Sequence, residues 1–189
     1  MIILASQSPR RAALLDQIGI AYQVVPAHVD ETLHADERAA DYVERVALAK
    51  AAAVHALHPD RVVLAADTAV VLDQQILGKP RDRDDALNVL ASLSGRTHEV
   101  LTGVAVASVE RRYALNVSRV VFRALTDAEI AAYWDSGEPA DKAGAYAVQG
   151  IAAAFIERIE GSYSGVMGLP LFETMALLHQ AGVHADWES

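Results

Sequence analysis

The sequence of 189 residues contains no cysteine. This absence excludes disulfide bonds, thiolate metal sites and a cysteine nucleophile, and it suits a cytoplasmic protein. No apolar run approaches the roughly 18 residues that a membrane-spanning helix needs. The amino terminus, Met-Ile-Ile-Leu-Ala-Ser, also lacks the basic segment that opens a signal peptide. We therefore expect neither export nor insertion into a membrane.

Positive charge is scarce as well. The chain has 16 Lys and Arg against 25 Asp and Glu, a formal net charge of −9. Proteins that follow a phosphate backbone usually carry an excess of Lys and Arg, so we do not expect a nucleic-acid polymer as partner. A small anionic ligand with its own metal ion remains compatible. The only lysines are Lys50, Lys79 and Lys142, a scarcity that codon bias also explains.

Hydrophobic residues make up 52% of the chain, enough for a full core in one α/β domain or two small lobes. Periodicity and turn residues predict alternating strands and helices. Strand-like apolar runs lie at 2–4, 22–25, 62–66, 69–72, 97–109, 113–125 and 155–159. Helical patterns lie at 9–18, 38–58, 84–94, 126–134 and 170–181.

The first eleven residues combine a strand, a short loop and a helix start. Ile2–Leu4 is typical of a buried strand, and Ser8-Pro9 is typical of an N-cap followed by proline at the first helical position. A helix N-terminus presents unpaired N–H groups and a partial positive charge. Arg10 and Arg11 add two full charges there, which a bound anion would offset. The alternative is an ordinary capped helix with two solvated arginines.

Two acidic positions are candidates for chemistry. Asp67 stands between two apolar runs, where a carboxylate is expensive to bury unless it is paired, bound to metal or placed in a cleft. We regard it as the strongest catalytic candidate; the alternative is that it accepts hydrogen bonds from nearby backbone. Glu31 lies in the polar connection 28–37, where loop side chains can converge on a ligand or simply be solvated.

Two further segments carry polar groups on constrained backbone. Lys79 is flanked by Gly78 and Pro80, which fix the chain and keep the amine accessible. In the polar insertion 137–150, two glycines and small neighbours indicate close approach by a ligand or another backbone, and Lys142 and Gln149 are its polar groups. The seven histidines show no metal-ligand spacing, and we expect His98 to be structural.

The chain carries an ordered series of six motifs. They are Leu4-Ala5-Ser6-Gln7-Ser8-Pro9-Arg10-Arg11, Ala66-Asp67-Thr68, Gly78-Lys79-Pro80, Ser94-Gly95-Arg96-Thr97-His98, Asp141-Lys142-Ala143-Gly144-Ala145-Tyr146-Ala147-Val148-Gln149-Gly150, and Gly161-Ser162-Tyr163 through Gly168-Leu169-Pro170. Each motif alone is weak, but the ordered series is specific and spans about residues 2–175. Taken together, the motifs closely resemble the Maf family of nucleoside triphosphate pyrophosphatases.

The resemblance implies a single Maf-like domain over 1–189 with the α/β fold shared with inosine triphosphate pyrophosphatases. In that fold an elongated mixed central sheet has flanking helices and two lobes around a cleft. The resemblance also implies hydrolysis of a nucleoside triphosphate to the monophosphate and pyrophosphate with Mg²⁺ or Mn²⁺. Ala-Asp-Thr together with Lys-Ala-Gly-Ala-Tyr-x-x-Gln-Gly is similar to the dTTP/UTP branch, and modified pyrimidine nucleotides are further candidate substrates. A cytoplasmic homodimer is expected.

The resemblance also implies roles for individual residues. Asp67 matches the base, and Glu31 with Asp67 matches the metal ligands. Arg10, Thr68 and Gln149 match positions associated with substrate choice. The Gln149 amide can both donate and accept, so it can pair with O4 and N3–H of uracil or thymine. The residues expected to bind phosphate are Ser6, Ser8, Arg11, Lys50 and Lys79, with Lys142 either joining them or only fixing its loop.

Two other readings of function stay open. One is a nucleotide-binding regulator of cell division, since the family is associated with septum formation. Binding alone needs the cations but not an acid such as Asp67 placed for water, so the intact Asp67 and Glu31 favour an enzyme. The other is a pyrophosphatase of the same fold that acts on 7-methyl-GTP or another nucleotide.

Overall fold

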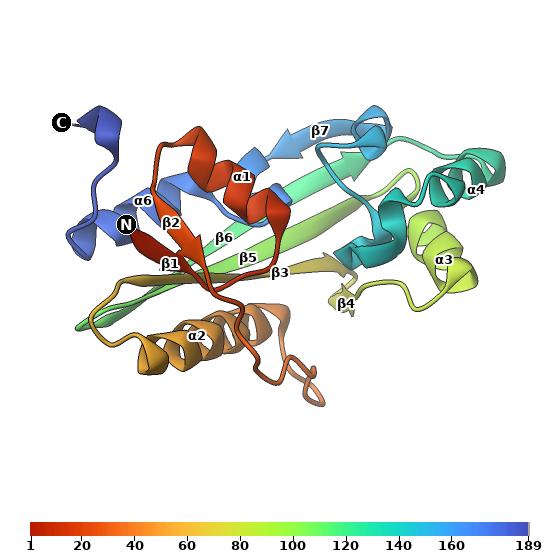
Figure 1. Ribbon diagram of the computed structural model, residues 1–189. Coiled ribbons are helices and arrows are strands. Elements are labelled where there is room, and N and C mark those ends of the chain that lie inside the picture. The colour runs from red at the N-terminus through yellow and green to blue at the C-terminus, as the bar shows by residue number, and fades with distance from the viewer. Residues whose placement is uncertain (189) are drawn as a thin grey trace.

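The computed structural model describes residues 1–188 and is an α/β protein with a central sheet flanked by helices (Figure 1). The strands are β1 (Ile2–Leu4), β2 (Tyr22–Val24), β3 (Val63–Leu72), β4 (Gln75–Leu77), β5 (Thr97–Ala107), β6 (Arg111–Phe122) and β7 (Ile156–Glu160). The helices are α1 (Pro9–Gln17), α2 (Ala39–Leu57), α3 (Arg83–Leu93), α4 (Asp127–Asp135), α5 (Tyr163–Met167) and α6 (Leu171–Gln180). Short 3₁₀ segments are η1 (Glu138–Asp141), η2 (Ala143–Ala145), η3 (Ile151–Phe155) and η4 (Asp186–Glu188). Among these residues, every helix is too short or too polar to span a lipid bilayer.

Within residues 1–188 the strands form one seven-stranded sheet in the order β2-β1-β3-β5-β6-β7, with β4 paired to β3. β1 is parallel to β2 and β3, whereas β3, β5, β6 and β7 are antiparallel neighbours. A parallel pair needs a crossover connection, and here α2 supplies one on the path from β2 to β3. The predicted α/β class with a mixed central sheet is therefore confirmed.

A gap in strand pairing lies along one edge of β3. β1 pairs with β3 only as far as Leu64, and β4 pairs with it only from Val70 onward. The other edge is paired with β5 from Val63 to Val71. Between the two short strands, the edge around Asp67 and Thr68 has no strand partner within residues 1–188. The loop that follows β1 therefore faces the middle of β3 across an opening in the sheet.

Helix α2 packs very closely on one face of the sheet, opposite α1 and α6 (Figure 1). Its small residues Ala47 and Ala51 lie in a buried cluster with Ala65 of β3. A Cβ on Gly103 of β5 would come within 2.8 Å of the backbone oxygen of Val43. Because no side chain separates helix from sheet at this point, Lys50 of α2 reaches the middle of β3.

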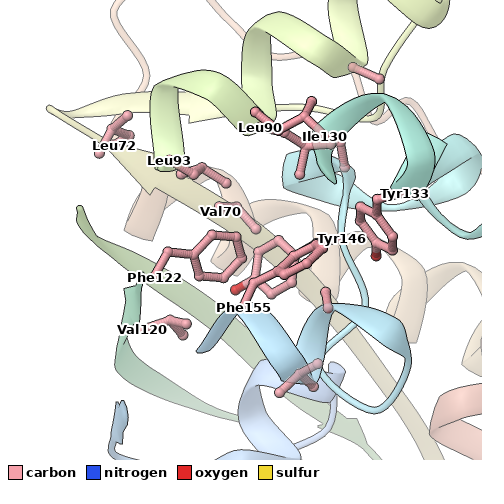
Figure 2. Packing of buried hydrophobic residues seen from close by; sticks show 14 of the residues in the cluster. Val70, Leu72, Leu90, Leu93, Val120, Phe122, Ile130, Tyr133, Tyr146 and Phe155 are labelled. Carbon is pink, nitrogen blue, oxygen red and sulfur yellow. The ribbon is translucent and has the colours of Figure 1, made fainter. Parts of the chain in front are cut away.

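A second core fills the end of the molecule between the sheet and helices α3 and α4. Figure 2 shows Tyr146 and Phe155 lying between Phe122 of β6 and Tyr133 of α4. The rings of Tyr133 and Phe155 meet edge to face at 5.1 Å between centroids, and those of Phe122 and Tyr146 at 4.9 Å. Such aromatic contacts add to the apolar burial and hold the segment after α4 against the sheet.

The structure corrects several details of the predicted elements. Residues 63–72 form one continuous strand rather than two runs, and β4 and α5 are elements that the periodicity does not reveal. The insertion 137–150 is largely buried from Gly144 to Val148, so its glycines serve close packing as much as loop geometry. Gly144 illustrates this, because a Cβ there would lie 2.8 Å from the side chain of Val70.

Candidate active site

The gap beside β3 opens into a cleft of about 610 Å³. Its walls come from the β1–α1 loop, α2, β3, the segment after β4, the η1–η2 region and α5. The cleft brings together every candidate residue predicted from the sequence: Ser6, Ser8, Arg10, Arg11, Glu31, Lys50, Asp67, Thr68, Lys79, Lys142 and Gln149.

The β1–α1 loop delivers a helix start to the cleft, as the Ser8-Pro9 pattern predicts. Ser8 is the N-cap with extended backbone, and Pro9 occupies the first helical position. The Ser8 hydroxyl makes no capping hydrogen bond, while its backbone N–H donates to Ser6 Oγ at 3.1 Å. Both serine hydroxyls line the cleft near the positive end of α1.

Two arginines of α1 are held by backbone carbonyls at the end of α5. Arg11 Nε donates to the carbonyl of Gly168 at 2.8 Å, and Arg10 Nε donates to that of Met167 at 3.3 Å. Burial lowers the pKa of both guanidinium groups, while Asp67 opposes this for Arg11 and Asp141 for Arg10. Arginine stays protonated under such a shift, so two oriented cations face the cleft.

A chain of hydroxyl groups continues from Arg11 across the sheet. Arg11 Nη2 donates to Thr68 Oγ1 at 3.3 Å, and Thr68 Oγ1 lies 3.0 Å from Thr102 Oγ1. Thr102 donates its single hydroxyl proton to the carbonyl of Gly165 at 2.8 Å, so the Thr68 hydroxyl is the donor to Thr102. Thr102 is fully buried on β5 and was not a candidate from sequence, because nothing local distinguishes it from other strand threonines.

Lys50 joins the two acidic candidates. Its Nζ lies 2.8 Å from Asp67 Oδ1 and 2.9 Å from Glu31 Oε1. Lys50 and Asp67 are both buried, whereas Glu31 comes from the exposed loop. Because both carboxylates reach the same ammonium group, they are close enough to share one cation. Paired carboxylate oxygens are also the donors that Mg²⁺ and Mn²⁺ prefer, so this pair fits a divalent metal.

Tyr42 of α2 is a further cleft residue that the sequence analysis missed. Its hydroxyl donates to the backbone carbonyl of Glu31 at 3.1 Å and so ties the acidic loop to the helix. Burial raises the pKa of Tyr42 to about 12, and the negative charges of Asp67 and Glu31 add to the effect. The sequence places Tyr42 only within the helical pattern at 38–58, and its contact with the loop is visible only in the fold.

The opposite wall of the cleft carries the remaining candidates. Lys79 is exposed after β4, and Lys142 pairs with the neighbouring Asp141. That pairing lowers the pKa of Asp141, and Arg10 adds to the effect. Gln149 stands at the tip of a turn with its side chain exposed, while its neighbours Ala147 and Val148 are buried. This wall therefore offers the amide of Gln149 and the amines of Lys79 and Lys142, which stand on long flexible side chains, rather than buried charges.

The predicted structural role of His98 agrees with its surroundings. The ring is buried, its Nε2 lies 2.8 Å from Tyr146 Oη, and burial lowers its pKa to about 4. The seven histidines show no metal-ligand spacing in the sequence, but the fold brings donor atoms of His179, His184 and Glu188 within 4.8 Å of one another at the exposed carboxyl-terminal end. This cluster lies outside the cleft lining and arises from the fold of the last turn.

Charge in the cleft suits a polyanion that brings a metal. Five of its described lining residues are cationic (Arg10, Arg11, Lys50, Lys79 and Lys142) and three are acidic (Glu31, Asp67 and Asp141). Arg10 and Arg11 stand in the first turn of α1, while Glu31 and Asp67 both contact Lys50. A buried acid next to bound phosphate can orient or deprotonate water, so the arrangement can support hydrolysis.

Comparison with known proteins yields many similar sequences. The chain is 52% identical to the dTTP/UTP pyrophosphatase of Hahella chejuensis over 96% of this chain and 92% of that one. It is 55% identical to the dTTP/UTP pyrophosphatase of Methylobacillus flagellatus over 96% and 93%, and 50% identical to that of Myxococcus xanthus over 100% and 96%. Among solved structures, the Ham1 protein of Staphylococcus aureus matches with a TM-score of 0.47 and 16% identity over 64% of this chain and 71% of that one. The model of the family described as Maf-like protein matches residues 1–181. The chain therefore belongs to the Maf family.

Proposed function

We propose that this protein hydrolyses dTTP and UTP to the nucleoside monophosphate and pyrophosphate. The observation that carries the proposal is the buried pair of Lys50 and Asp67, which opens into the same cleft as the exposed Gln149 amide. The dTTP/UTP pyrophosphatases named above support it through their identity over nearly the whole chain. Pyrimidine nucleotides modified without loss of O4 or N3–H fit the same proposal.

The triphosphate would bind at the start of α1. Arg10 and Arg11, already oriented by carbonyls of Met167 and Gly168, would pair with phosphate oxygens, with Lys79 and Lys142 reaching in from the opposite wall. Ser6 and Ser8 would donate hydrogen bonds beside the helix N-terminus. These charges stabilise the negative charge that develops on pyrophosphate as it leaves.

Hydrolysis needs a water molecule that attacks the α-phosphorus opposite the leaving pyrophosphate. Asp67 would accept a proton from that water while the new P–O bond forms and the bond to the bridging oxygen breaks. Lys50 holds the Asp67 carboxylate in place at 2.8 Å. Glu31 and Asp67 would hold Mg²⁺ or Mn²⁺, which supplies positive charge to the phosphates when bound.

Base selection would come from the opposite wall. The Gln149 amide would donate to O4 and accept from N3–H of uracil or thymine. Arg10 and Thr68, which also match substrate-choice positions, line the same cleft.

Pyrophosphate release from dTTP, UTP, dCTP, CTP, GTP and 7-methyl-GTP, each with Mg²⁺ or Mn²⁺, tests the proposal. Wild-type protein should turn over dTTP and UTP preferentially, and Asp67→Asn should lower kcat about 10³-fold because the base is lost. Asp73→Asn changes an exposed acid in the turn that follows the same strand and should keep full activity. Nucleotide binding without turnover would favour the regulatory reading, and activity that survives in Asp67→Asn would remove Asp67 from the mechanism.

We also propose a cytoplasmic homodimer. Exposed Leu115 and Val117 of β6 support the dimer, because they lie on the α2 side of the sheet where the helix covers β3 and β5. The cytoplasm is where nucleoside triphosphates are made and used. Light scattering, which measures the molar mass in solution, tests the dimer.

A further inference from the structure

Gln149 occupies the third position of a tight turn that runs from Ala147 to Gly150. The backbone N–H of Gly150 donates to the carbonyl of Ala147 at 3.0 Å and closes the turn. Within residues 1–188 the Gln149 amide itself has no hydrogen-bond partner. An amide that rotates by half a turn exchanges its donor and acceptor, and so fits cytosine as readily as uracil. Selection therefore depends on what fixes the position of Gln149.

Two side chains hold the two ends of this turn. Tyr133 Oη of α4 accepts a hydrogen bond from the backbone N–H of Ala147 at 3.2 Å. Glu138 Oε2 accepts one from the backbone N–H of Ile151 at 3.0 Å, just beyond Gly150. Tyr133 and Glu138 are themselves joined, because Tyr133 Oη donates to Glu138 Oε1 at 2.7 Å.

The direction of these hydrogen bonds is fixed by chemistry. A carboxylate only accepts, so the phenol proton of Tyr133 points to Glu138 and leaves an oxygen lone pair for the Ala147 N–H. Burial raises the pKa of Tyr133, and the hydrogen bond to Glu138 raises it further. The phenol stays protonated at neutral pH, so the network keeps one arrangement.

The turn also packs directly on the Glu138 carboxylate. A Cβ on Gly150 would lie 2.2 Å from Glu138 Oε2, so a side chain at position 150 would displace this carboxylate from its hydrogen bonds. Tyr133 is anchored in turn by the edge-to-face contact of its ring with Phe155 in the buried cluster of Figure 2. The backbone that carries the exposed amide is thus connected through two contacts to the core between the sheet and α4.

We propose that Tyr133 and Glu138 are positioning residues for base selection. They hold the backbone of the Ala147–Gly150 turn, so that the Gln149 amide approaches the edge of uracil or thymine from one position and the turn cannot move to follow cytosine. The inference rests on the proposed function, since it concerns how that activity selects its substrate. A hydrogen-bonding group discriminates between bases only when the surrounding structure prevents it from adapting.

Tyr133→Phe tests the inference, because it removes the shared hydroxyl and keeps the ring. The measurement is kcat and KM for dTTP, dCTP, UTP and CTP with the full chain. We expect the dTTP:dCTP ratio of kcat/KM to fall about tenfold, mostly through a higher KM for dTTP, as expected for two altered hydrogen bonds. The kcat for dTTP should change little, since Asp67 and Lys50 lie on the opposite wall.

Two further variants separate positioning from simple loss of structure. Tyr113→Phe is the matched control, because the Tyr113 hydroxyl is buried on β6 without a hydrogen-bond partner in the described chain; it should leave the ratio unchanged. Glu138→Gln replaces one acceptor by a donor and should lower the ratio in the same direction as Tyr133→Phe. A partly unfolded variant loses activity on all four nucleotides equally, so the ratio is insensitive to folding.

The outcomes distinguish the two proposals. Wild-type protein that turns over neither dTTP nor UTP overturns the proposed function, and the inference falls with it. Wild-type protein that selects dTTP, with a Tyr133→Phe variant whose ratio stays within twofold, overturns the inference alone. A fall in the dTTP:dCTP ratio in both Tyr133→Phe and Glu138→Gln, with no fall in Tyr113→Phe, supports the inference.

Discussion

The two walls of the cleft hold their functional groups in different ways. One wall, formed by α1, α2 and β3, is here called the phosphate wall. Its residues Lys50, Asp67 and Arg11 come from regular elements, and their charges are paired or bonded to backbone. The opposite wall, which carries the Ala147–Gly150 turn, is here called the base wall. Gln149 comes from this turn, and its amide has no hydrogen-bond partner in the described chain. Buried charges must be paired where they stand, whereas an exposed amide is fixed only through its backbone. The walls should therefore fail differently when they are perturbed.

The largest effect is expected from the phosphate wall. Lys50→Met leaves the carboxylates of Asp67 and Glu31 close together without their shared cation. Removal of one partner from a buried pair costs about 3 kcal/mol, so the melting temperature should fall sharply and hydrolysis of dTTP with it. Added Mg²⁺ or Mn²⁺ should restore part of the stability if the two carboxylates hold a metal, which calorimetry measures without reference to activity.

Lys79→Met is the matched control for this variant. Lys79 lies on the exposed segment after β4, so its replacement should leave the melting temperature unchanged. Equal stability of Lys50→Met and wild type would contradict the view that Lys50 holds the two acids together.

Acid should lower the free energy of unfolding through His98, whose ring contacts Tyr146 behind the base wall. Burial lowers the pKa of His98 to about 4, whereas an unfolded histidine titrates near 6.5. The folded state thus binds the proton less readily, so this contribution to stability is complete above pH 6.5 and is lost as the pH falls toward 4. Between pH 7 and pH 4.5 we expect a loss of about 2 kcal/mol, measured by urea unfolding.

His98→Gln sharpens that test, because glutamine can keep a hydrogen bond to Tyr146 but does not titrate. The variant should be less stable than wild type at pH 7 and should lose less stability on acidification. An identical pH dependence in the two proteins would show that His98 does not carry the effect.

The smallest effect on stability is expected from the hydroxyl chain of Thr68 and Thr102 on β3 and β5. Thr102→Val keeps the shape of the side chain but removes the acceptor of the Thr68 hydroxyl and the side-chain donor to the Gly165 carbonyl, which keeps its hydrogen bond from the N–H of Gly168. Stability should fall by about 1 kcal/mol. The KM for dTTP should rise a few-fold, because Thr102 then no longer holds the Thr68 hydroxyl that accepts from Arg11. Urea unfolding and steady-state kinetics measure the two effects.

Thr174→Val provides the comparison. Thr174 is equally buried, but its hydroxyl has no hydrogen-bond partner in residues 1–188. Its replacement should be neutral or slightly stabilising, and equal effects of the two valine variants would contradict the role of the hydroxyl chain.

Much of the fold and the composition of the site could be predicted from the sequence. Ser8-Pro9 predicted the start of α1, and the helical pattern at 126–134 predicted α4, whose first turn is closed by a capping box of Thr126 and Glu129. The buried run around Asp67 predicted an acid in a cleft. These signals are local, since caps and periodicity depend on residues a few positions apart.

Tertiary structure alone decided how those residues meet. Arg11 is held by Gly168, 157 positions away in the chain, and no local pattern encodes that contact. The gap on β3 exists because its pairing with β1 ends at Leu64 and its pairing with β4 begins at Val70, which depends on strand register. The clamp of Tyr133 and Glu138 on the Gln149 turn likewise requires α4 and the turn to pack on one core. The sequence by itself determined which groups are available for chemistry, and the packing of distant segments decided which of them are fixed and in what orientation.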